Sequence, residues 1–82
     1  MPEDRQRRVG PLSMKNHVYK LVELTGTSSV SIEDAVAGAL KRAHKTTKNL
    51  RWFQVLEARG DIDNGKVDHW QVTIKVGHTL DA

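Results

Sequence analysis

The sequence has no cysteine, only two prolines and only four aromatic residues among its 82 positions. The absence of cysteine excludes a disulfide framework, a cysteine zinc site, a thiol nucleophile and a cysteine-ligated iron–sulfur cluster. The apolar runs are a few residues long, so none can span a bilayer, and no secretory signal pattern is present. A cytoplasmic location fits these features. So small a chain needs one tight core or association with copies of itself.

The positive charge of the chain is concentrated before its first predicted strand. The formal net charge is +3; residues 1–16 hold four basic and two acidic residues, whereas residues 17–82 hold nine and eight. Binding to a phosphate backbone needs a basic stripe on the fold itself, so a nucleic-acid partner is not expected. Residues 1–16 lack periodicity and contain both prolines. We interpret them as a disordered leader, with a functional basic arm as the alternative.

The first half of the remaining chain predicts a strand and then a helix. Residues 17–25, HVYKLVELT, are rich in β-branched and aromatic residues, and Gly26-Thr27-Ser28-Ser29 is expected to end this strand. Ser31 followed by Asp34 resembles a capping box, which marks a helix start. The next apolar residues are spaced three and one apart and form one helical face: Ile32, Ala35, Val36, Ala39, Leu40 and Ala43.

Two further strands are predicted, over residues 50–62 and 66–76. Asn64-Gly65 between two such runs predicts a hairpin with a type I′ turn, because that turn needs positive φ at both positions. In the last strand, one face carries Trp70, Val72, Ile74 and Val76, and the other carries His69, Gln71, Thr73 and Lys75. The predicted fold is α+β in the order β-α-β-β, a three-stranded antiparallel sheet with one amphipathic helix packed on one face.

One helix covers only one face of such a sheet. With a two-residue turn, Gln71 lies opposite Ala58, and strict alternation places four apolar residues on the uncovered face: Trp52, Leu56, Ala58 and Ile62. A face this apolar is unusual for a small monomer and predicts self-association. The same register puts Glu57 opposite Val72 on the helix side, so we also expect a β-bulge that shifts the phase.

No catalytic apparatus is visible, so the chain is not expected to be an enzyme. There is no serine in a strand–turn–helix elbow. The histidines are scattered without an acidic partner at useful spacing; they are His17, His44, His69 and His78. Four carboxylates around the hairpin could attract a divalent cation, although such clusters are more often turn chemistry and solvated charge; they are Glu57, Asp61, Asp63 and Asp68. No metal site is therefore assigned.

Trp52 and Gln71 are the residues whose pattern suggests a ligand. Trp70 alternates with Val72 and Ile74, which core packing explains. Trp52 instead opens a strand on the face without a helix, where it either packs on a neighbouring subunit or forms a stacking platform for a flat aromatic ligand. Gln71 offers a donor and an acceptor, which suits a ring edge with C=O and N–H groups, although a solvated glutamine is the more common case.

Five segments, in this order and spacing, closely resemble the dodecin family: HVYKLVELTGTS, the amphipathic helix, NLRWFQVLEARG, the DNGKV turn and HWQVTIKVG. The most specific combination is Trp-Phe after Asn-Leu-Arg, followed eighteen residues later by Trp-Gln-Val-Thr. The resemblance covers residues 16–82 and leaves out only the leader. It implies a hollow shell of twelve subunits with the helix outward, in which flavins bind in pairs stacked between tryptophans of two subunits.

Carried onto this chain, the resemblance implies that Trp52 stacks on the flavin and Gln71 hydrogen-bonds the isoalloxazine edge, with Glu57 and Asp61 near the ring or tail. It implies a storage or buffering protein that sequesters riboflavin, lumichrome or FMN and quenches their photochemistry without turnover. Within one chain, Trp52 and Gln71 are separated by roughly 20 Å at about 3.3 Å per residue, so both can serve one ligand only from different subunits.

Two positions depart from the family pattern. Bacterial members often have histidine or arginine at the position of Asp61, where an acid repels a flavin phosphate; this favours riboflavin or lumichrome over FMN. His78 stands where an aromatic residue, usually phenylalanine, is common.

Two other functions remain open on the sequence. A dodecin-like shell could hold a metal ion or a coenzyme A-type nucleotide through its charged groups. A small nucleic-acid-binding module could use the arginine-rich leader; deleting residues 1–13 would then abolish salt-sensitive binding, and Trp52→Ala would have little effect.

Overall fold

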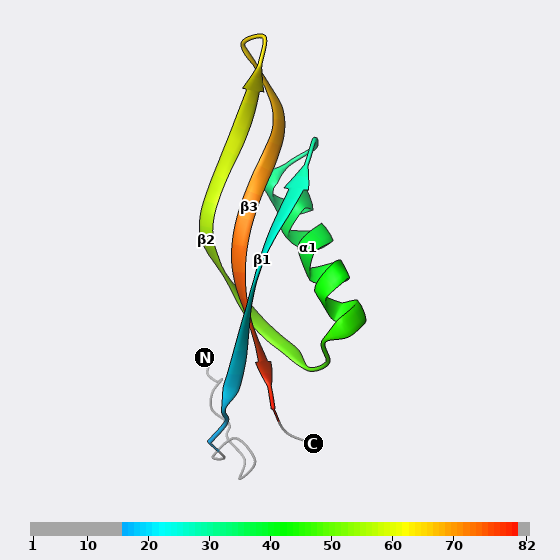
Figure 1. Ribbon diagram of the computed structural model, residues 1–82, viewed down its shortest axis with the longest axis vertical. Coiled ribbons are helices and arrows are strands. Elements are labelled where there is room, and N and C mark those ends of the chain that lie inside the picture. Colours follow the sequence, from blue (N-terminus) through cyan, green and yellow to red (C-terminus); the bar gives the residue numbers. More distant parts are fainter. Residues whose placement is uncertain (1–15, 81–82) are drawn as a thin grey trace, which may run out of the picture.

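The computed structural model describes residues 16–80, so the predicted leader lies almost entirely outside the described residues. Strand β1 (Tyr19–Ser28) is followed by helix α1 (Ile32–Thr46) and by strands β2 (Leu50–Asp63) and β3 (Lys66–Thr79). The strands form one antiparallel sheet in the order β1-β3-β2. The β2–β3 hairpin extends beyond the ends of β1 and α1 (Figure 1). The predicted β-α-β-β fold with one helix is confirmed.

Strand β1 runs further than its composition predicts. The expected break at residues 26–29 is wrong for residues 26–28, which pair with residues 70–72 of β3. Pairing with the central strand therefore outweighs the turn propensity of Gly-Thr-Ser. Gly26 is required here for space, because a Cβ would collide with the carbonyl oxygen of Ala35 and lie 3.1 Å from the Ala39 Cβ. The helix packs this close because its inner face carries alanines.

Helix α1 begins at the predicted cap, where Ser31 Oγ accepts a hydrogen bond of 3.0 Å from the Asp34 backbone N–H. An aspartate is one methylene shorter than the usual capping-box glutamate, and its carboxylate has a different partner: it accepts from Ser28 Oγ at 2.7 Å. Ser28 Oγ in turn accepts from the backbone N–H groups of Val30 and Ser31 at 2.9 and 3.3 Å. This network ties the end of β1 to the start of α1.

Replacing the cap residue tests this account of the helix start. We expect Ser31→Ala to lower the free energy of unfolding by about 1 kcal/mol, the usual loss for an N-cap serine. Thermal unfolding at matched protein concentration measures it, since the Tm of an associating chain depends on concentration. Ser29→Ala is the control, because Ser29 is exposed and lies outside the helix. Equal losses for the two variants would show that the cap contributes nothing.

The β2–β3 turn has the predicted geometry. Asn64 and Gly65 have φ of 54° and 77°, the two positive values that a type I′ turn requires. Beyond the turn, the ladder is interrupted at three places, each with one residue that has no partner on the other strand: Asp68 in β3, and Leu56 and Arg51 in β2. The predicted bulge is therefore confirmed, and there is more than one.

The bulges change which residues face one another. Gln71 lies opposite Arg59, not opposite Ala58 as predicted, because the extra residue in β3 moves the register by one position. The same shift places Glu57 opposite Thr73. Glu57 thereby leaves the side of the sheet that α1 covers.

The core lies between α1 and the side of the sheet that faces it, the inner face. As predicted, Val72, Ile74 and Val76 line this face; all are fully buried, and each such side chain contributes about 1.5–3 kcal/mol relative to exposure. Helix α1 packs on β1 and β3 and hardly touches β2. Phe53 and Val55 on the inner side of β2 consequently remain 46% and 45% exposed.

Candidate functional site

The side of the sheet without a helix, the open face, is mostly polar, contrary to the prediction. Of the four apolar residues predicted there, only Trp52 is confirmed, by its pairing with Gly77. The bulges break the alternation that placed the others: Leu56 is an unpaired bulge residue, and Ala58 and Ile62 lie on the inner side. The open face also carries Tyr19, Leu21, Glu23, Thr25 and Thr27 of β1, Gln54, Glu57, Arg59 and Asp61 of β2, and His69, Gln71, Thr73 and Lys75 of β3.

Trp52 forms an aromatic platform at the end of β2 that is remote from the hairpin turn. Its indole packs over Gly77, where no side chain intervenes. Tyr19 meets it edge-on, with ring centroids 5.9 Å apart and ring planes at 71°. Trp52 is nevertheless 38% exposed. The indole is thus held by two contacts within the chain and presents the rest of its surface to a ligand or another subunit.

Gln71, Glu57 and Asp61 lie on the hairpin half of the open face, where the pairs of Glu57 and Asp61 are each two ladder pairs from that of Gln71. Gln71 is six residues along β3 from Gly77, the partner of Trp52. At about 3.3 Å per residue this is roughly 20 Å, far longer than a tricyclic ring. The structure therefore gathers three of the four predicted site residues and leaves Trp52 apart from them.

His69 has two acidic partners, so the prediction that no histidine has one is wrong. Its Nδ1 lies 2.8 Å from Oδ2 of Asp68 and its Nε2 lies 2.9 Å from Oδ2 of Asp61. The hydrogen bond to Asp68, aided by the charges of Asp61 and Asp68 and opposed by desolvation, raises the pKa of His69 above its ordinary value of 6.5. Arg59 Nη2 is 4.0 Å from Asp61 Oδ1. The negative charge of Asp61 is therefore partly offset.

An apolar groove runs between α1 and β2 on the inner side of the sheet. One part, of about 500 Å³, is lined chiefly by Ile32, Val36, Leu40, Phe53 and Val55. A neighbouring hollow of about 520 Å³ shares Ala37, Leu40 and Phe53 with it, and its lining adds Lys41, His44, Leu50, Arg51, Trp52 and Val76. Phe53 and Val55 are exposed to this groove because α1 leaves β2 uncovered.

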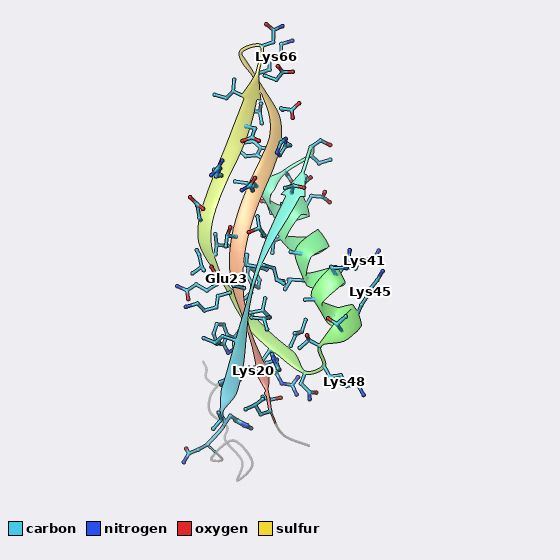
Figure 2. All side chains as sticks on the ribbon, in the orientation of Figure 1. Lys20, Glu23, Lys41, Lys45, Lys48 and Lys66 are labelled. Carbon is cyan, nitrogen blue, oxygen red and sulfur yellow. The ribbon has the colours of Figure 1, made fainter. Side chains whose placement is uncertain are left out.

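The basic residues of the folded part are dispersed. Figure 2 shows Lys41 and Lys45 on the outer side of α1, Lys66 at the hairpin tip and Lys20 on β1. The part of the chain that the structure describes contains no helix long and apolar enough to cross a membrane. Among residues 16–80, no three histidine, aspartate or glutamate side chains come together as metal ligands would.

Sequence reasoning missed the neighbours that define these sites: His69, Tyr19 and Gly77. His69 was placed on the correct face, but its pairing with Asp61 depends on the bulge at Asp68, which the pattern does not locate. A glycine inside a strand commonly marks a place where another group approaches closely, so Gly77 was a usable signal.

Comparisons with known proteins agree on one family. The Dodecin family model matches residues 18–81. The dodecin of Thermus thermophilus is 48% identical over 64 residues, which cover 78% of this chain and 93% of that protein. The structure of dodecin from Streptomyces davaonensis has a TM-score of 0.77 and 43% identity, covering 83% of this chain and 100% of that one. Calcium dodecin from Mycobacterium tuberculosis, described as a calcium chelating antigen with a novel calcium-binding site, has a TM-score of 0.68 and 31% identity, covering 78% and 91%.

Proposed function

The chain belongs to the dodecin family, and we propose that it binds flavins between tryptophans of two subunits and stores them without catalytic turnover. The observation that carries this proposal is the partly exposed indole of Trp52 on the open face, roughly 20 Å from the hydrogen-bonding side chain of Gln71. Within one chain, Gln71 is too far from Trp52 to hydrogen-bond the edge of a ring that stacks on the indole. This separation suits a pocket that two chains build together.

The chemistry of the two residues matches an isoalloxazine ring. Stacking of a flat heteroaromatic ring on an aromatic side chain is worth about 1–3 kcal/mol, and the indole supplies the largest such surface. The Gln71 amide can donate to a ring C=O and accept from a ring N–H. Electron transfer from the indole to an excited flavin at van der Waals contact competes with flavin photochemistry. Such a site sequesters and quenches its ligand.

The charges around Gln71 favour a flavin without a phosphate. Asp61 and Glu57 lie on the same half of the open face and are expected near the ring edge or tail. A carboxylate near a flavin phosphate is unfavourable, although Arg59 and His69 weaken the effect of Asp61. We therefore propose riboflavin or lumichrome as the preferred ligand, with FMN bound more weakly.

Assembly follows from the same geometry. The groove between α1 and β2 exposes Phe53 and Val55, which a small chain normally buries. We propose that this surface is covered by neighbouring subunits in a homododecamer, as the family resemblance implies. The cytoplasmic location remains a prediction from the sequence.

Calcium is the second candidate ligand, because a relative at 29% identity over 63 residues is named calcium dodecin. Among the described residues of a single chain, no three carboxylate or histidine side chains are arranged as metal ligands. The stacking platform, by contrast, is already present in one chain, and flavin is the better supported proposal.

A fluorescence titration tests the proposal. Riboflavin, lumichrome and FMN are titrated separately into ligand-free protein, and the quenching of ligand fluorescence is followed. We expect strong quenching by riboflavin that saturates at one flavin or half a flavin per chain. Absence of quenching by all three ligands would contradict flavin storage. Calorimetry with calcium then tests the second candidate on the same sample.

A further inference from the structure

We propose that Gly77 is a positioning residue of the ligand site, because the absence of a side chain there lets the Trp52 indole lie flat on β3 with one ring face outward. The inference rests on the proposed flavin function and adds the requirement that position 77 carries no side chain. Gly77 never touches the ligand; it acts only through Trp52.

The approach of the indole to Gly77 is face-on. A Cβ built on Gly77 would lie 2.7 Å from Trp52 Nε1, and closer still to Cε2 and Cζ2. The nearest of the three atoms is Cε2, which is bonded to the other two. A Cβ that met the ring edge would touch the outer atoms Nε1 and Cζ2 first, so contact at the fusion atom means that it meets the ring face.

The backbone at Gly77 does not itself need a glycine. Among the described glycines, positive φ occurs at Gly65 and not at Gly77. Alanine can therefore adopt the local backbone, and the three atoms that its Cβ would lie nearest to all belong to the indole. Because the backbone tolerates alanine and the new Cβ meets the indole, Gly77→Ala directly tests the position of Trp52.

Tyr19 and Gly77 together fix the platform. Gly77 occupies one face of the indole, and Tyr19 meets its edge at 71°. Only the opposite face remains for a stacked ring, so each chain offers one stacking surface. Aromatic side chains that cover a cross-strand glycine are a known way of filling the gap that glycine leaves in a sheet.

The chain contains a matched control. Gly60 lies opposite Trp70 as Gly77 lies opposite Trp52, so both are strand glycines paired with a tryptophan. A Cβ on Gly60 would lie 3.4 Å from Trp70 Cε3 and 3.5 Å from the His69 carbonyl oxygen, which are ordinary contacts. Gly60→Ala therefore adds the same methyl group without displacing an indole.

We expect Gly77→Ala to weaken riboflavin binding by about tenfold or more, while Gly60→Ala changes it by less than about twofold. The readout is the quenching titration, and circular dichroism and size-exclusion chromatography check that each variant folds and assembles. Equal affinities of the wild type and a folded Gly77→Ala variant would overturn the inference while leaving flavin binding intact.

A second readout does not depend on flavin. In a Trp70→Phe background, Trp52 is the only tryptophan. Adding Gly77→Ala should then shift the Trp52 emission to longer wavelength and increase its quenching by acrylamide, because the indole leaves the strand. An unchanged spectrum would contradict the inference even if no flavin binds.

A double variant covers the case in which Gly77→Ala assembles poorly. Alanine at position 52 removes every atom that the new methyl group meets, so Gly77→Ala with Trp52→Ala relieves the overlap. We expect this pair to have the Tm of Trp52→Ala alone, although not the affinity of the wild type. A lower Tm would show that the methyl group conflicts with something other than Trp52 and would overturn the inference.

Discussion

Trp52→Ala is expected to weaken riboflavin binding by about 5- to 150-fold, which corresponds to the roughly 1–3 kcal/mol that stacking on one aromatic side chain contributes. Quenching of bound flavin should be lost as well, because the indole is the proposed electron donor. Fluorescence titration measures both effects on one sample. Trp52 contacts Tyr19 and Gly77, so the fold and assembly of the variant are checked by circular dichroism and size-exclusion chromatography.

Trp70→Phe is the control for Trp52→Ala. Trp70 pairs with Gly60 in the hairpin and is half-buried on the other side of the sheet. We expect its replacement to leave affinity and quenching within about twofold of the wild type. Equal losses in the two variants would point to general destabilisation, and unchanged binding in Trp52→Ala would contradict the platform.

The second large effect concerns the choice between FMN and riboflavin, and it depends on pH. Below the raised pKa of His69, the imidazolium lies between Asp61 and Asp68 and offsets their charge. Above that pKa, His69 is neutral, and the Asp61 charge acts more strongly on a flavin phosphate. The affinity for FMN relative to riboflavin should therefore fall, by about three- to tenfold, as the pH rises from about 5.5 to about 8.

Variants separate this effect from the titration of FMN itself, whose phosphate loses its second proton near pH 6. Asp61→Asn should raise the FMN-to-riboflavin affinity ratio at about pH 8 above that of the wild type, because the carboxylate charge is removed. His69→Gln should remove the part of the pH dependence that histidine supplies and leave only that of the phosphate. If the wild type and His69→Gln give the same profile, His69 does not control the Asp61 charge.

Local sequence signals predicted the elements of this fold correctly. The Asn64-Gly65 turn and the spacing of apolar residues in α1 depend on backbone conformation and amphipathicity within a few residues. The end of β1 was wrong because Gly26 and its neighbours are held in the sheet by pairing with β3, which no local signal reports. Tertiary context decided where the strand stops.

The positions of the candidate site residues in the sheet were only partly predicted. Gln71 was placed on the open face correctly by the alternation in β3. Trp52 was placed there correctly because the extra residues Asp68 in β3 and Leu56 in β2 shift the register in opposite directions and cancel. The pattern around Glu57 indicated a bulge but located none of the three, and the bulge at Asp68 decides that Asp61 meets His69. Strict alternation also gave an apolar open face, whereas in the structure polar residues predominate there, and Phe53 and Val55 are exposed beside α1.

The central claim is that assembly builds the pocket, with Trp52 from one chain and Gln71 from another. Trp52→Ala and Gln71→Ala chains carrying different tags are coexpressed, and oligomers that contain both are purified through the two tags. Each variant alone should bind riboflavin weakly. Mixed oligomers combine the intact Trp52 of one chain with the intact Gln71 of the other, so tight quenching sites should return, at about a quarter of the wild-type number for random mixing. Mixed oligomers that bind no better than the two parent variants would show that both residues act within one chain and would contradict the account.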